Sequence, residues 1–277
     1  MTRFVIAPDS FKESLSAHDA CQAIERGILA MLPTAECRCI AMADGGEGTL
    51  DAIMNAIESK KIATQVQGPM PEQQIDTYFA LVDQGQTAII EMAKANGIGL
   101  LTPEQRNPML TSTYGTGQML QHALNLGVKR IVVTLGGSVT NDGGSGFAQA
   151  LGVRFYNALG QELNVCGGNL DQIADIDLTH LDTRFKDIEI IIASDVSNPL
   201  CGNTGASHIF GPQKGATPAM VQQLDANLAH YAGKVSKVIG QDVAGQQGAG
   251  AAGGLGFALM AFCGAHMQSG ATFVIEQ

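Results

Sequence analysis

The chain has 277 residues, of which 45% are hydrophobic and 15% are charged, a composition typical of a globular protein. Its formal net charge of −10, with no concentration of Lys or Arg, argues against nucleic acid as a partner. The six cysteines form neither a CxxC pair nor a metal-like spacing, which is typical of a reducing compartment. The apolar runs near the N-terminus and at residues 255–263 are too short for a signal peptide or a membrane span. We therefore expect a cytoplasmic protein with no membrane partner.

The first segment predicts the order strand, helix, strand, helix. An apolar run at residues 4–7 ends at a proline and predicts a short buried strand. Ser16 is a suitable N-cap for a helix over residues 17–32, which carries apolar residues along one stripe. A second strand over 36–42 and a helix over 50–58 follow. This alternation is typical of a parallel α/β layer.

The segment Gly68-Pro69-Met70-Pro71 interrupts this order and predicts a domain boundary, with residues 1–66 before it and 67–277 after it. Two strand candidates, 76–82 and 87–91, then predict a hairpin and hence a mixed sheet. The end of the second domain falls at about residues 245–277.

The later elements continue the α/β pattern. We expect helices over 113–126 and 147–151, buried strands over 130–135 and 189–193, and an apolar helix after the Gly/Ala run at 245–256. Residue 273 looks like the start of another strand. The fold class is therefore α/β, with two α/β domains.

Four loops share one design: a buried strand, then a segment with Asp and Ser or Thr, glycine-rich in two of the four, then the start of a helix. They span residues 7–14, 43–49, 135–144 and 193–200. Glycine lets backbone N–H groups at a helix N-terminus approach an anion, and the hydroxyls of Ser138 and Thr140 can add donors. Because an α/β sheet places its ligands at the carboxyl ends of its strands, these loops predict a phosphate site.

Three aspartates, Asp44, Asp142 and Asp195, stand at these strand ends. Two or three such carboxylates can hold Mg²⁺ through waters and phosphate oxygens, or one of them can accept a proton from a substrate hydroxyl. Lys12 offers a point charge for a phosphate. In any single loop an N-cap or turn role explains the aspartate equally well, but four loops together favour a phosphate and metal site.

The combined motifs resemble those of the bacterial glycerate kinases that begin with an APDSFK sequence. The matching stretches are residues 7–14, 43–49 (ADGGEGT), 114–117, 136–144 (GGSVTNDGG), 193–200 (ASDVSNPL), 210–216 (FGPQKGA) and 248–256 (GAGAAGGLG). The resemblance implies phosphorylation of D-glycerate by ATP with Mg²⁺, at the 2-hydroxyl. It also implies a first domain formed by both chain ends and a second domain inserted between them.

The motif positions, together with side-chain chemistry, assign the candidate roles. Lys12 and Asp195 are the candidate catalytic residues, Asp195 as the base that orients the glycerate hydroxyl. The candidate metal ligands are Asp44, Glu47 and Asp142. The candidate substrate and phosphate ligands are Ser10, Gly136, Gly137, Ser138, Thr140, Asn198 and Lys214.

One departure from the family pattern leaves alternatives open. Members of the family continue beyond the helix that follows residues 248–256, so we expect this chain to lack their C-terminal segment. The second hypothesis is an inactive truncated fragment that only binds a hydroxy acid or assembles, as a homodimer or by domain swapping. A third is another α/β enzyme, such as a phosphatase or an oxidoreductase. The absence of a dinucleotide fingerprint and of a Cys or Ser nucleophile with a nearby His disfavours it.

Overall fold

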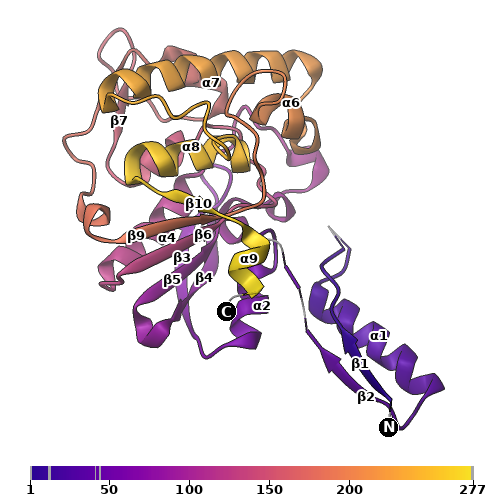
Figure 1. Cartoon of the computed structure of the whole chain (residues 1–277). Coiled ribbons are helices and arrows are strands. Elements are labelled where there is room, and N and C mark those ends of the chain that lie inside the picture. The colour runs from indigo at the N-terminus through magenta and orange to yellow at the C-terminus, as the bar shows by residue number, and fades with distance from the viewer. Residues whose placement is uncertain (1, 12–13, 41, 44, 276–277) are drawn as a thin grey trace.

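The computed structural model of the chain describes residues 2–11, 14–40, 42–43 and 45–275 (Figure 1). A six-stranded sheet forms its centre, with the strand order β10-β9-β6-β5-β4-β3. Strands β5, β6, β9 and β10 run parallel, whereas β4 runs antiparallel to both β3 and β5. The bounds are β3 (Lys60–Gln67), β4 (Gln74–Val82), β5 (Thr87–Glu91), β6 (Arg130–Thr134), β9 (Glu189–Ala193) and β10 (His266–Gln268). The predicted mixed sheet and the α/β class are confirmed.

One face of the sheet packs against the main helical layer. This layer contains α4 (Tyr114–Asn125), α5 (Ser145–Ala150), α7 (Pro218–Ile239) and α8 (Ala251–Cys263), with α7 outermost (Figure 1). Successive side chains of a strand point to opposite faces, so Ile90 and Val133 join this core while Ile89 and Val132 face the other way. Burial on both faces explains why β6 and β9 read as continuous apolar runs.

The opposite face is covered by two short helices, α2 (Thr49–Ala56) and α9 (Gly270–Ile275). Leu50, Ile53 and Phe273 pack there in one buried cluster that includes Ile89 of the sheet. The strand predicted to start at residue 273 is wrong, because the chain turns into α9 after Ser269 and Phe273 packs onto the sheet.

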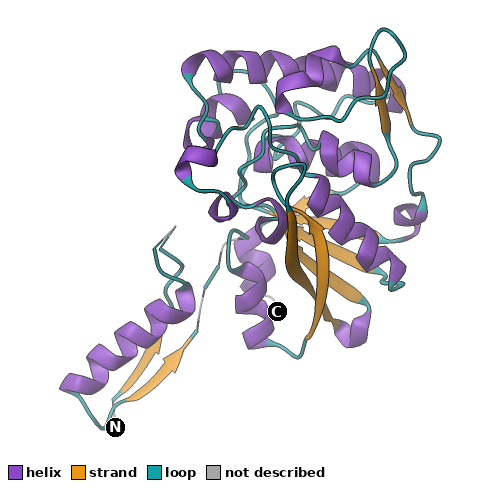
Figure 2. Cartoon of the chain, turned by 180° about the vertical axis from the view of Figure 1, so that it is seen from behind, coloured by secondary structure: helices purple, strands orange, loops and turns teal. Residues whose placement is uncertain are grey.

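A smaller unit at the N-terminus contains β1 (Arg3–Ile6), α1 (Ala17–Met31) and β2 (Glu36–Cys39), and it stands apart from the main body (Figure 2). The two strands are parallel. Ser16 is the N-cap of α1, as predicted, since its side chain accepts a hydrogen bond from the Asp19 N–H at 3.1 Å. The division of the chain at residue 66 stays a prediction; β3, which runs across it to Gln67, pairs along its whole length with β4.

The remaining elements surround the main helical layer. They are α3 (Ala93–Asn96), α6 (Ala206–Phe210) and the antiparallel pair of β7 (Arg154–Tyr156) with β8 (Asp175–Asp177). None of the helices in the described part of the chain is both long and apolar enough to cross a bilayer.

The carboxylate of Asp142 ties two helix N-termini together inside the main core. Its side chain is fully buried and accepts hydrogen bonds from Thr113 N and Thr113 Oγ1, both at 2.8 Å, and from the N–H groups of Gly144 and Gly146 at 3.1 and 3.2 Å. These contacts join the start of α4 to the start of α5. The metal role expected for Asp142 stays a prediction, and four donors already contact its oxygens.

We expect Asp142→Asn to lower the free energy of unfolding by about 1–3 kcal/mol, because an amide N–H₂ would then face backbone N–H donors. Urea denaturation measures this change. Asp171→Asn is the control, since Asp171 is exposed and should change stability by less than about 0.5 kcal/mol. Equal stability of the two variants would contradict this role for Asp142.

We also expect Leu50→Ala to destabilise the protein by about 2–5 kcal/mol, because the Leu50 side chain of α2 is fully buried against the sheet. The matched control is Ile24→Ala on α1, where the side chain is 44% exposed. Thermal and urea unfolding compare the two variants. A Leu50→Ala protein no less stable than the control would show that α2 does not hold this face of the sheet.

Candidate active site

Three of the four predicted strand-end loops, two of which carry glycine, meet at the carboxyl ends of β6 and β9. A Cβ atom on Gly136 would lie 2.4 Å from the Cα atom of Gly46, and one on Gly45 would lie 2.9 Å from the carbonyl oxygen of Ala193. Neither distance leaves room for a side chain, so the loops at 45–48, 136–138 and 193–195 are in backbone contact. These three loops therefore lie side by side, and the phosphate site expected at them stays a prediction.

Glu47 stands at this junction with an exposed side chain. A Cβ atom on Gly137 would lie 3.5 Å from the Cβ atom of Glu47, and one on Gly99 would lie 3.6 Å from Glu47 Oε1. The carboxylate therefore lies beside two glycines that leave the space around it open.

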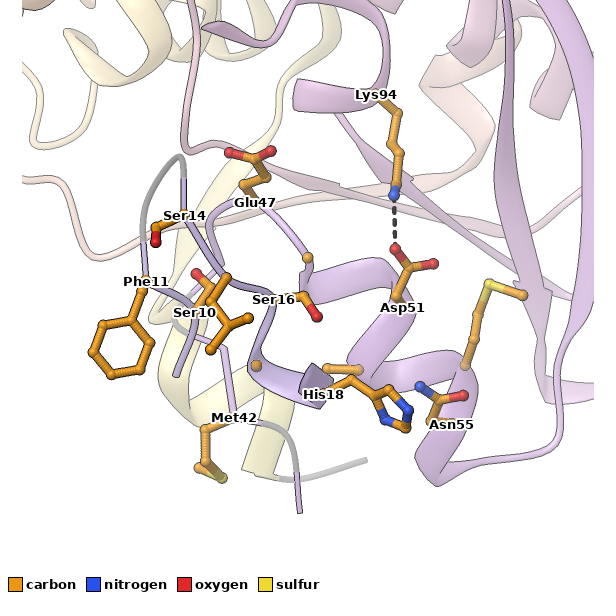
Figure 3. Close-up of a pocket in the computed structure, with 15 residues that line it drawn as sticks. Ser10, Phe11, Ser14, Ser16, His18, Met42, Glu47, Asp51, Asn55 and Lys94 are labelled. Atoms are coloured by element: carbon orange, nitrogen blue, oxygen red, sulfur yellow. Dashed lines mark hydrogen bonds and ion pairs between the residues drawn. The ribbon is translucent and has the colours of Figure 1, made fainter. Parts of the chain in front are cut away.

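A cavity of about 700 Å³ lies between the N-terminal unit and α2 (Figure 3). One wall carries Ser10, Phe11, Ser14 and Ser16 from the segment that leads into α1, and His18 from the first turn of that helix. The other wall carries Glu47, Asp51, Asn55 and Lys94. Segments far apart in the sequence thus supply polar groups to one space.

An ion pair stands on the second wall. Lys94 Nζ donates a hydrogen bond to Asp51 Oδ2 at 2.7 Å, and the Tyr78 hydroxyl donates to Asp51 Oδ1 at 2.5 Å. Burial by itself would raise the pKa of Asp51, but the hydrogen bonds from Lys94 and Tyr78 outweigh it and lower that pKa. Burial would likewise lower the pKa of Lys94, but Glu91 and Asp51 raise it. Both groups are therefore charged at neutral pH.

The buried Glu91 holds the start of α2, which forms part of this wall, in place. Its carboxylate is 1% exposed and accepts hydrogen bonds from the N–H groups of Gly48 at 3.0 Å and Leu50 at 2.9 Å. Burial raises the pKa of Glu91, while the charge of Lys94 and the two backbone donors act against that rise. The contacts fix the start of α2, with Glu47 and Asp51 close by in the chain.

The buried Lys214 stabilises the loop after β6 by hydrogen bonds. Its ammonium is buried and donates to Ser138 Oγ at 2.8 Å and to the carbonyl oxygen of Thr140 at 2.6 Å. Ser138, Thr140 and Lys214 are thus brought together, but they do not line the cavity.

The loop after β9 holds the other predicted residues. The exposed Asp195 accepts hydrogen bonds from Ser269 Oγ at 2.7 Å and from the Ala271 N–H at 3.1 Å, at the start of α9. Asn198 donates to the carbonyl oxygen of Thr204 at 2.8 Å. Neither residue lines the cavity. Lys12 and Asp44 lie outside the described residues, and the roles of all the predicted site residues stay predictions.

Sequence reasoning missed Asp51, Glu91 and Lys94. The segment Glu91-Met92-Ala93-Lys94 lies at the end of a buried strand, like the four chosen loops, but it carries no Gly, Asp, Ser or Thr. Asp51 looks like an ordinary acidic residue in the first turn of a helix. The position of Glu91 and Lys94 at the end of a buried strand could have marked them as candidate site residues.

Comparison with known proteins agrees with this architecture. The glycerate kinase family model matches residues 4–277. The glycerate 2-kinase of Escherichia coli (strain K12) is 47% identical over 272 residues, which are 98% of this chain and 71% of that protein. The glycerate kinase of Halalkalibacterium halodurans is 45% identical over 276 residues, covering 100% of this chain and 72% of that protein.

A solved structure supports the same assignment. It is a crystal structure described as glycerate kinase 2 from Salmonella typhimurium LT2, with a TM-score of 0.85 and 44% sequence identity. The match covers 99% of this chain and 73% of that one. The chain therefore belongs to the glycerate kinase family of enzymes.

Proposed function

We propose that this chain transfers a phosphoryl group from ATP to the 2-hydroxyl of D-glycerate. The observation that carries the proposal is the cavity lined by Ser10 and Glu47, from two family-type motifs, and by the Lys94–Asp51 pair (Figure 3). Phosphoryl transfer needs little covalent chemistry from the protein, which must mainly position the two reactants and stabilise charge. A cavity lined by hydroxyls, carboxylates and one ammonium suits that task.

In our proposal, different residues of this chain bind glycerate, approach the phosphates and act as the base. The cavity holds glycerate, with the Ser10 hydroxyl available as a donor, while the glycine loops at 45–48 and 136–138 bring backbone close to the phosphates. Asp195, which lies outside the cavity lining, remains our candidate for the catalytic base. Its exposed position at the end of β9 supports this role, although its carboxylate already caps the start of α9.

The donor set fits Mg²⁺. Among the described residues no three His, Cys, Asp or Glu side chains are placed to hold a metal ion together. Kinases usually bind Mg²⁺ through one or two carboxylates plus the phosphates of the nucleotide, however, and Glu47 offers an exposed carboxylate in the cavity. Glu47 would hold the ion, which when bound supplies positive charge to the phosphates.

Two further points belong to the proposal. All six cysteines are free, which supports a reducing cytoplasm as the location. The exposed Val5 and Met31 of the N-terminal unit support assembly with a second copy, which stays a prediction.

The test is ADP release by this 277-residue chain with ATP, Mg²⁺ and D-glycerate, with the product read by phosphorus NMR. We expect glycerate-dependent ADP release and 2-phosphoglycerate. A folded protein that binds glycerate without turnover would contradict the proposal and favour a binding or assembly role instead.

We expect Glu47→Gln to lower kcat at least about tenfold and to raise the Mg²⁺ concentration needed for half-maximal rate, because the exposed carboxylate is lost. The melting temperature should not change, since the side chain is exposed. Glu58→Gln, also exposed and just beyond α2, is the control for the change of charge. An unchanged kcat and Mg²⁺ dependence would remove Glu47 from the site.

A further inference from the structure

Lys94 contributes positive charge to the cavity. Among the described residues that line this space it is the one lysine or arginine, and its side chain is 22% exposed. The chain as a whole has a net charge of −10, and Glu47 and Asp51 add negative charge to the same walls. Within the described part of the lining, Lys94 is therefore the lysine or arginine that attracts an entering anion.

The position of the Lys94 ammonium is fixed by two neighbours. Besides its hydrogen bond to Asp51, it lies 4.8 Å from the centre of the Tyr78 ring. Lys61 lies 3.7 Å from the same ring centre but outside the cavity, on strand β3. An ammonium has three N–H donors, and Asp51 takes one of them. Lys94 can thus donate to a ligand without leaving its partner.

Asp51 offers the complementary group. Its carboxylate accepts one hydrogen bond from Lys94 and one from Tyr78, whereas two carboxylate oxygens provide about four acceptor positions. The side chain is 49% exposed and lines the cavity. The wall thus presents a cationic donor and an anionic acceptor side by side.

We propose that Lys94 and Asp51 are the specificity-determining pair for the acceptor substrate and select 2-hydroxy carboxylic acids. Such an acid carries a carboxylate and a hydroxyl on neighbouring carbon atoms. The carboxylate accepts a charge-assisted hydrogen bond from Lys94, and a hydroxyl donates to Asp51. The inference rests on the proposed function, because it concerns the acceptor of that reaction.

The test compares kcat/KM for D-glycerate with kcat/KM for D-glyceramide, which keeps both hydroxyls but carries no charge. The unaltered protein should prefer glycerate about 10- to 100-fold, as expected for a hydrogen bond between charged groups. Lys94→Met should abolish this preference through a higher KM for glycerate, with little change in kcat/KM for glyceramide. Lys61→Met, which removes the other charge on Tyr78, should behave like the unaltered protein. Lys94→Arg should restore part of the preference.

Two more variants keep the test decisive. Lys94→Gln retains an N–H donor for Asp51 and replaces Lys94→Met if that variant does not fold. Asp51→Asn should raise KM for glycerate and glyceramide alike, since both carry the hydroxyls. A Lys94→Gln protein that still prefers glycerate, or an Asp51→Asn protein with unchanged KM values, would overturn the inference while the proposed function stands. Absence of glycerate-dependent ADP release from the unaltered protein would instead refute the proposed function.

Discussion

The buried carboxylate of Glu91 joins the end of strand β5 to the first turn of helix α2, through the N–H groups of Gly48 and Leu50. Burial of a carboxylate costs free energy unless hydrogen bonds compensate, and a helix N-terminus supplies both free N–H donors and a favourable dipole. The contact fixes α2 on the sheet. Since Glu47 directly precedes Gly48 and Asp51 directly follows Leu50, the two carboxylates of the cavity wall are placed by the same contact.

A second constraint comes from glycine at the sheet edge. The loops after β6 and β9 approach the loop before α2 so closely that Gly45 and Gly136 have no room for a Cβ atom. Backbone contact of this kind lets three segments that are distant in the sequence form one surface, with Glu47 at its edge. The glycine-rich motifs are therefore explained by chain packing as well as by any ligand that approaches the backbone.

The sequence predicted the elements that are buried on both faces, because a continuous apolar run is a strong signal of a central strand. Strands β6 and β9 were found in this way. Strand β3 was missed, because it lies at the edge of the sheet and carries mostly polar residues, with only Val66 fully buried. Helix α7 was also missed, although Thr217 and Gly240 cap its two ends.

The candidate site could be predicted only in part, because local sequence patterns identify single residues but not which distant residues lie together. Motif residues such as Ser10 and Glu47 could be chosen from local patterns, and the fold brings these two to one cavity. The position of Lys94 opposite Ser10 depends on how α2 and the N-terminal unit lie on the sheet, which no local pattern contains. Helix-cap and core contacts of Asp142 are equally invisible in sequence, where it resembles a ligand.

In a protein of net negative charge, a single lysine is not enough to select an organic acid as ligand. The carboxylates of Glu91 and Asp51 raise the pKa of Lys94 and so keep it charged, but they also weaken its attraction for a simple anion. A ligand that brings both a carboxylate for Lys94 and a hydroxyl for Asp51 recovers part of that loss, because it satisfies both members of the pair. The negative charge around Lys94 therefore acts as a filter that favours hydroxy acids over other small anions.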